Sequence, residues 1–194
     1  TSGTLIGTNT ASLAGGITLA DNSTISNTGS LTLSGTINDA NNSFSLTKSG
    51  TGTLILSNAN TFDGGVTMNA GTLNAGNATA LGTCTLTLNG GTFGATSNLT
   101  FANAVSLGAS ANIGGSNNFT LSGIISGANA LNIVGSNTIT LSGNNTYTSQ
   151  TNINSGTLTI SHANALGTTA AGTVVANGAT LEINGVAVGN EALT

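Results

Sequence analysis

The amino-acid sequence predicts an all-β protein, a parallel β-helix (β-solenoid) of about nine coils. Three observations lead to this fold: a long internal repeat, a composition that suits stacked strands, and many short segments in which apolar and polar residues alternate. Internal repetition means stacked units, each of which buries its apolar face against the next. A multi-sheet sandwich shares the alternation but does not predict the long repeat.

The internal repeat relates two long parts of the chain. Residues 52–83 align with residues 137–168 without a gap at an offset of 85, and fourteen of the 32 aligned positions are identical. Upstream, segments 33–35 and 40–41 have counterparts at an offset of 88. We therefore expect a three-residue slip between the two blocks, placed in a turn.

The composition narrows the choice of repeat fold. Only 3% of the residues are charged, 29 are glycine, and proline and tryptophan are absent. Low charge with 38% hydrophobic residues is the opposite of the signature of disorder. Thr and Asn are poor helix formers. The lack of proline suits interior strands, because each of them donates N–H groups to a neighbouring coil.

Short strands are expected in succession, each with apolar side chains at i and i+2 and with Thr, Ser or Asn between them. Those of the first copy are residues 31–33, 44–46, 54–56, 66–68 and 86–88, and those of the second are 119–121, 131–133, 139–141 and 158–160. Gly, Asn and Ser at 90–91, 114–116 and 143–145 supply the corners, because they tolerate positive φ angles.

Two or three such strands fit into roughly 20 residues, about one coil of a parallel β-helix. We expect a single solenoid segment over residues 1–194, with long repeats at about 31–115 and 119–194 and a partial repeat at 1–30. Like Asn and Thr side chains on successive coils are expected to form ladders. The alternation predicts eight inward side chains: Leu54, Leu56, Met68, Leu73, Ile139, Leu141, Ile153 and Leu158.

Two segments, residues 48–73 and 141–158, the second followed by Ala163-Asn-Ala-Leu-Gly167, resemble the autotransporter passenger-associated β-strand repeat. Ser149 and Gln150 stand where the family has a Gly pair, so that turn is expected to differ. The resemblance implies a right-handed β-helical stalk in a large bacterial surface or secreted protein, often an adhesin. It implies an extracellular or cell-surface location, with association to the outer membrane through parts outside this chain.

The chain offers little for chemistry, and we expect no enzyme activity, cofactor or metal site. The alternative is a β-helical polysaccharide lyase or hydrolase, which would stack carboxylates across coils. Asp21, Asp39 and Asp63 follow one another at intervals of 18 and 24, close to one coil. A lyase also needs basic residues, Lys or Arg, to bind a uronate carboxylate, and Lys48 is the only such residue in the chain. We therefore expect Asp21, Asp39 and Asp63, together with Glu182 and Glu191, to be isolated surface carboxylates.

Four further residues are expected to be structural. Cys84 has no second cysteine with which to form a disulfide or a metal cluster, and we expect a half-buried filler. His162 aligns with Asn77 of the first copy in a polar turn. Phe62 and Tyr147 occupy equivalent positions, which favours one packing post in each repeat over a sugar-stacking platform.

Charge excludes one class of partner: a net charge of −4 with one Lys and no Arg does not bind nucleic acid. No basic amphipathic helix or long apolar run indicates insertion into a membrane. Pairs of threonines, such as Thr138/Thr140 and Thr157/Thr159, leave ice binding as a minor alternative. The expected partners are neighbouring repeats, in the same or an identical chain, which stack end to end, and a glycan or protein of a cell surface. Both ends fall within the pattern, so we expect a section of a longer polypeptide.

Overall fold

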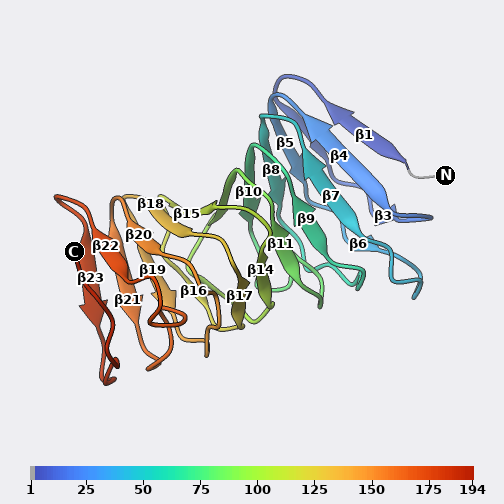
Figure 1. The fold of residues 1–194 in the computed structure, drawn as a ribbon. Coiled ribbons are helices and arrows are strands. Elements are labelled where there is room, and N and C mark those ends of the chain that lie inside the picture. Colours follow the sequence, from blue (N-terminus) through green and yellow to red (C-terminus); the bar gives the residue numbers. More distant parts are fainter. Residues whose placement is uncertain (1–2) are drawn as a thin grey trace.

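The computed structural model describes residues 3–194 and is a parallel β-solenoid, in which the chain winds through successive coils from one end to the other (Figure 1). The seven-stranded sheet A contains β1 (Thr4–Gly7), β4 (Ser23–Asn27), β7 (Leu46–Ser49), β9 (Val66–Met68), β11 (Leu86–Leu88), β14 (Val105–Leu107) and β17 (Ile125–Gly127). The nine-stranded sheet B contains β2 (Ala11–Leu13), β5 (Ser30–Leu33), β8 (Thr53–Leu56), β10 (Thr72–Ala75), β12 (Thr92–Ala95), β15 (Ala111–Gly115), β18 (Leu131–Gly135), β20 (Thr151–Ile153) and β22 (Thr173–Val175).

Two smaller sheets form the remaining side. The two-stranded sheet C pairs β3 (Ile17–Thr18) with β6 (Ile37–Asn38) near the N-terminal end. The five-stranded sheet D contains β13 (Leu99–Phe101), β16 (Phe119–Leu121), β19 (Thr138–Leu141), β21 (Thr157–Ile160) and β23 (Thr180–Ile183). All ladders between these strands are parallel, and the nine strands of sheet B confirm the prediction of about nine coils.

The length of one coil sets the register between strands. Thr72 pairs with Thr92 and Leu73 with Phe93, so these neighbouring coils are offset by 20 in the sequence. Apolar residues therefore stack on apolar residues through the interior, while Thr, Ser and Asn stack on the outside. The eight predicted inward side chains are all fully buried, which confirms the alternation as a predictor of the core. Asparagine ladders are also present: Asn152 Nδ2 donates to Asn132 Oδ1, and Asn132 Nδ2 donates to Asn112 Oδ1.

The three-residue slip lies in a turn, as predicted. Where neighbouring coils are usually offset by 20, Ser23 pairs with Leu46, an offset of 23. The extra residues lie in the turn between β6 and β7, in which Ala40, Asn41 and Ser43 have φ angles of 52°, 64° and 52°. Three non-glycine residues in the left-handed region need outside support, since this conformation is strained for them.

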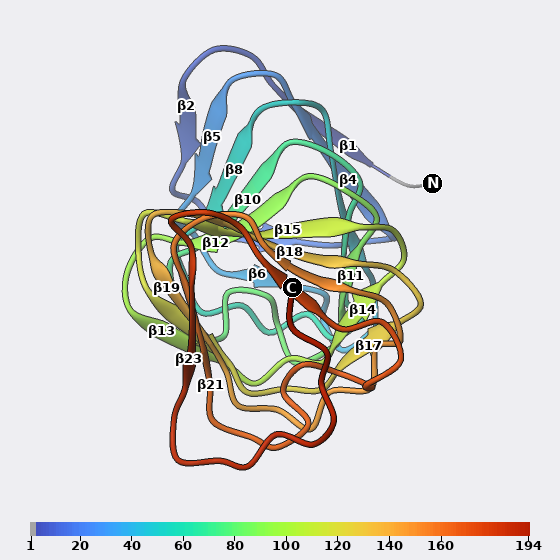
Figure 2. The ribbon, with the colours of Figure 1, turned by 60° about the vertical axis from the view of Figure 1, so that its left-hand side comes forward.

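The two repeats do not lie on the same side of the solenoid. In the first copy β8 and β10 belong to sheet B and β9 to sheet A, whereas their aligned counterparts β19 and β21 belong to sheet D and β20 to sheet B. The repeat offset of 85 exceeds four coils of 20 by five, which is about the length of one side. The second copy is therefore turned by one face relative to the first, as the oblique view in Figure 2 lets the reader follow.

The change of face coincides with an aromatic cluster in the core. Sheet D begins at β13, and sheet A ends at β17 a little further along. Phe93, Phe101 and Phe119 pack edge to face there, with ring centroids 5.4 to 5.8 Å apart. These large rings fill the interior where the cross-section changes, in the geometry that aromatic pairs prefer.

In each copy, one buried asparagine forms hydrogen bonds between coils on the side of the solenoid where regular strands stop. Asn60 Oδ1 accepts a hydrogen bond from Ile37 N at 2.7 Å, and Asn60 Nδ2 donates to Ala80 O at 2.7 Å. Asn145 makes the equivalent two bonds in the second copy, at 2.8 and 2.6 Å. The asparagine bridges three successive coils and lies one coil beyond the last strand of its side, β6 in the first copy and β17 in the second. It so satisfies backbone groups that a further strand would have paired.

The packing posts are confirmed, because Phe62 and Tyr147 are both fully buried. The buried Tyr147 hydroxyl lies 2.6 Å from Thr151 Oγ1 in a hydrogen bond. In the first copy the corresponding pair is Phe62 and Val66, which lacks both hydroxyls. The equivalent buried space is thus filled by a hydrogen-bonded polar pair in the second copy and by an apolar pair in the first.

Leu141→Asp tests the inward assignment. It buries an unpaired carboxylate in a fully buried site and is expected to cost roughly 3–5 kcal/mol of unfolding free energy. Thr140→Asp is the matched control, since Thr140 points outward from the same strand, and it should change stability far less. Thermal melting measures both, and equal melting temperatures for Leu141→Asp and the parent would contradict the inward position.

A double-mutant cycle tests the hydroxyl pair. Tyr147→Phe and Thr151→Val each leave one buried hydroxyl without its partner, so each is expected to cost about 1–2 kcal/mol. The double variant recreates the Phe62–Val66 pair and should be more stable than the sum of the two losses predicts. Urea unfolding gives the coupling energy, and strict additivity would show that the bond contributes nothing.

Candidate functional site

The structure brings two of the predicted carboxylates onto adjacent coils. Asp39 Oδ2 accepts hydrogen bonds from the backbone N–H of Phe44 at 3.1 Å and of Asp63 at 3.3 Å. Asp39 is 3% exposed, so its expected place on the surface was wrong. Burial raises the pKa of its carboxyl, but the backbone donors Asp63 and Phe44 outweigh burial and the pKa is lowered overall. Asp39 supports the turn of left-handed residues that carries the three-residue slip.

The other carboxylates lie apart from this pair. Asp21 Oδ1 accepts from the adjacent Asn22 N–H at 2.7 Å near the N-terminal end. Near the other end, Thr159 Oγ1 donates to Glu182 Oε2 at 2.8 Å and Thr173 Oγ1 donates to Glu191 Oε1 at 2.7 Å. Among residues 3–194 no three His, Cys, Asp or Glu side chains gather as metal ligands would. The carboxylates thus serve local backbone and hydroxyl donors.

Lys48 lies inside the solenoid, which the sequence reasoning did not foresee. Its ammonium is buried and donates to three carbonyl oxygens, those of Ser49 and Gly50 at 2.8 Å and of Ala70 at 3.1 Å. Burial lowers the pKa of this amine. The sequence does contain a signal for this burial. Lys48 is two residues from the inward Leu46, and it aligns with the buried Ile133 of the second copy. A lysine in this position does not reach a polysaccharide outside the coil.

His162 and Cys84 have the structural places that the sequence predicts. His162 Nδ1 accepts from the backbone N–H of Asn164 at 3.1 Å, as Asn77 Oδ1 accepts from Thr79 N at 3.0 Å in the first copy. The histidine therefore replaces an asparagine as the acceptor that closes a turn. Cys84 is half-buried, without a disulfide partner.

Outward threonines stack in columns, as expected for like side chains on successive coils, although the threonine pairs read from the sequence did not identify which residues form them. On sheet A one column runs through five threonines and two serines: Thr4, Thr24, Thr47, Thr67, Thr87, Ser106 and Ser126. On sheet D, Thr100, Thr120, Thr140 and Thr159 stack in the same way. The neighbouring column on sheet D changes from Asn118 on one coil to Thr138 on the next. Two threonine columns therefore run side by side over only a few coils. A shallow polar groove of about 270 Å³ lies on this face.

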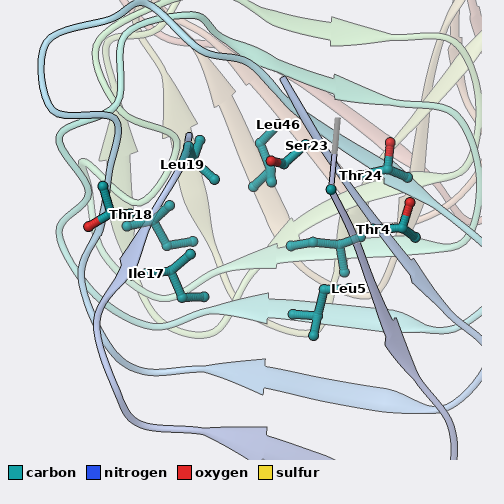
Figure 3. Close-up of a pocket in the computed structure, with 11 residues that line it drawn as sticks. Thr4, Leu5, Ile17, Thr18, Leu19, Ser23, Thr24 and Leu46 are labelled. Atoms are coloured by element: carbon teal, nitrogen blue, oxygen red, sulfur yellow. The ribbon is translucent and has the colours of Figure 1, made fainter. Parts of the chain in front are cut away.

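Apolar cavities lie at both ends of the solenoid. The N-terminal cavity, of about 230 Å³, opens between β1, β3 and β4, and Leu5, Ile17 and Leu19 point into it (Figure 3). At the C-terminal end, Leu181, Ile183 and Leu193 line a cavity of about 180 Å³. Both are continuous with the hydrophobic core, so the core reaches the surface at each end. No helix of the described residues is long and apolar enough to cross a membrane.

The pH dependence of stability should report on Asp39. Because its pKa is lowered by folding, the stabilisation is present above the usual carboxyl pKa of about 4 and is lost as the pH falls below it. Asp39→Asn should therefore lower the melting temperature at pH 7 and lower it less at pH 3. An unchanged melting temperature at pH 7, or the same difference at both pH values, would exclude this role.

The comparisons agree with the internal repeat. The family model described as passenger-associated-transport-repeat matches residues 46–75 and residues 134–160. A search of curated proteins and a search of solved structures found no match. The two matched segments are those that the internal alignment pairs, and the resemblance noted from the sequence is confirmed. The chain is a β-solenoid that carries two copies of the passenger-associated-transport-repeat, and this repeat and fold fit an autotransporter passenger.

Proposed function

We propose that this chain is a structural stalk segment of a bacterial passenger protein, placed outside the cell or on its surface, where it extends the polypeptide away from its anchor. The observation that carries the proposal is the unbroken sheet B, whose nine strands run the length of the solenoid. Such a sheet resists bending and stretching, because each coil is hydrogen-bonded along its backbone to the next. Loops and outer faces remain free to contact a glycan or protein, which gives the segment an adhesive role as well.

The placement of the charged side chains supports a structural role over a polysaccharide-degrading one. A lyase or hydrolase built on such a solenoid needs carboxylates and bases that face substrate together. Asp39 instead binds backbone N–H groups, and the Lys48 ammonium is enclosed by carbonyl oxygens. Both side chains support the stacking of coils.

A stalk built of interchangeable coils should change length without losing its fold. Deleting residues 112–131 removes one whole coil. Ala111 pairs with Leu131 and Val105 with Ile125 in the parent, so after the deletion Ala111 and Val105 occupy the positions of these partners and the register of the following coil is kept. Duplicating the same residues adds one coil. Small-angle scattering should give two rods that differ in length by roughly 10 Å, two inter-coil spacings, both with cooperative melting.

Deleting only residues 112–121 is the control, since the loss of half a coil sets strands against corners instead of against strands and should abolish cooperative melting. If the full-coil deletion unfolds as well, the coils are not interchangeable and the stalk proposal fails. Incubation of the parent with neutral and acidic polysaccharides distinguishes the alternatives. Binding without cleavage supports an adhesive stalk, whereas new reducing ends or unsaturated products would establish the enzyme.

A further inference from the structure

Sheet D presents two parallel columns of polar side chains on its outer face. On three neighbouring coils, in β13, β16 and β19, the residues at i and i+2 face outward; β13 and β19 are labelled in Figure 2. Neighbours within a column are about 4.8 Å apart, and the two columns are about 6.6 Å apart. The shallow groove of about 270 Å³ lies over them. The first column is Asn98, Asn118 and Thr138, and the second is Thr100, Thr120 and Thr140.

The groove is lined by hydrogen-bonding groups that the chain itself does not use. Elsewhere outer amides bond to one another, as in the asparagine ladder of sheet B and in the bond from Asn89 Nδ2 to Asn69 Oδ1 at 2.9 Å. On sheet D, Asn118 Oδ1 accepts from the Thr138 N–H at 2.8 Å, which fixes the amide and leaves its NH2 group without a partner among the described residues. Within residues 3–194, no hydrogen bond uses the side chains of Asn98, Thr100, Thr120, Thr138 or Thr140.

The charges around the groove select an uncharged ligand. No charged side chain lines the groove, and Lys48, the only Lys or Arg of the chain, is buried. The second column continues through Thr159, whose hydroxyl donates to Glu182 Oε2 on the next coil. A uronate or a sulfated sugar would find no cation to pair with, and this carboxylate would repel it. The face therefore suits a neutral ligand that is rich in hydroxyl groups.

The repetition of the columns suits an extended polymer. Each coil offers one pair of hydrogen-bonding side chains, one in each column, and the pairs repeat along the axis of the solenoid. A pyranose ring carries hydroxyls along both edges, and its length along an extended glycan is close to the spacing between coils. Successive sugars can therefore contact successive coils, directly or through bridging water. Individual contacts are weak, and affinity comes from their repetition.

An ice surface is the other repetitive ligand that such a face could bind. Ice binding would favour a flat array of paired threonines, but Asn98 and Asn118 interrupt one column and the face is hollowed. Asparagine amides add donors and acceptors beside the threonine hydroxyls, a mixture that suits the varied hydroxyl directions of a sugar. The observations therefore favour a glycan.

We propose that the outer face of sheet D binds a neutral polysaccharide, which lies along the axis of the solenoid with one sugar at each coil. The inference rests on the adhesive part of the proposed function and assigns it to one groove. Thr100, Thr120 and Thr140 bind one edge of the glycan, and Asn98, Asn118 and Thr138 bind the other. Binding requires no metal or cofactor and breaks no bond.

Native electrophoresis through gels that contain polysaccharide tests this groove. Dextran, galactomannan, xylan and hydroxyethyl cellulose are the neutral probes, and alginate and chondroitin sulfate are the acidic ones. At least one neutral probe should retard the parent, and the acidic probes should not. The double variant Thr120→Val and Thr140→Val keeps the branched shape but removes two hydroxyls, and it should raise the dissociation constant roughly tenfold. Thr67→Val with Thr87→Val is the matched control, because these half-buried threonines are neighbours in the sheet A column, and it should bind like the parent.

Four results would overturn the proposal. A parent that no neutral probe retards has no such site, and equal binding by the parent and the sheet D variant places adhesion elsewhere. Tighter binding of an acidic probe contradicts the charge argument, and a parent that stops the growth of ice crystals without binding glycan assigns the face to ice. Asn98→Ala, which removes no hydrogen bond within the chain, replaces the double variant if melting shows that the latter is unfolded. The stalk itself is tested by the coil deletion, so a failure of this groove is distinguishable from a failure of the stalk.

Discussion

Backbone hydrogen bonding between coils is the interaction on which the rest of the structure depends. Strands donate and accept along their length to the equivalent strand of the next coil, and this pairing holds through the nine strands of sheet B. The pairing fixes which side chains face inward, and so explains why apolar residues recur at every second position. It also explains where polar side chains are needed inside. Asn60 and Asn145 replace strand pairing on the irregular sides, and Asp39 replaces it at the turn of the long coil.

Much of this fold follows from patterns that are local and strict. Alternation over three residues placed Leu54, Met68 and Leu158 in the core, because a period of two leaves no other face for them. The offset change from 85 to 88 placed extra residues in a turn, because an insertion within a strand would shift the register of everything beyond it. The equivalence of Phe62 and Tyr147 identified two packing posts, because both copies must fill the same space.

Other features depend on distances that the sequence does not display. The burial of Lys48 required knowing that carbonyl oxygens of two neighbouring coils converge on its ammonium. The role of Asp39 depended on Asp63 lying directly above it, which their separation in the sequence suggests only loosely. The places of two side chains were predicted, since Cys84 is half-buried and His162 closes a polar turn. The columns of threonine on sheets A and D were expected only in general terms, because their members lie a full coil apart and threonine pairs in the sequence compare near neighbours.

The turn by one face has a geometrical consequence for any protein built from several such units. Each unit advances the solenoid by a little over four coils and rotates its irregular side by about a third of a revolution. Three units in series would bring that side back to its starting direction, so equivalent loops would trace a slow spiral around the stalk. A receptor or antibody approaching from any azimuth would then meet the same loop at one of three heights. A unit of four whole coils would instead line up all its loops along a single stripe.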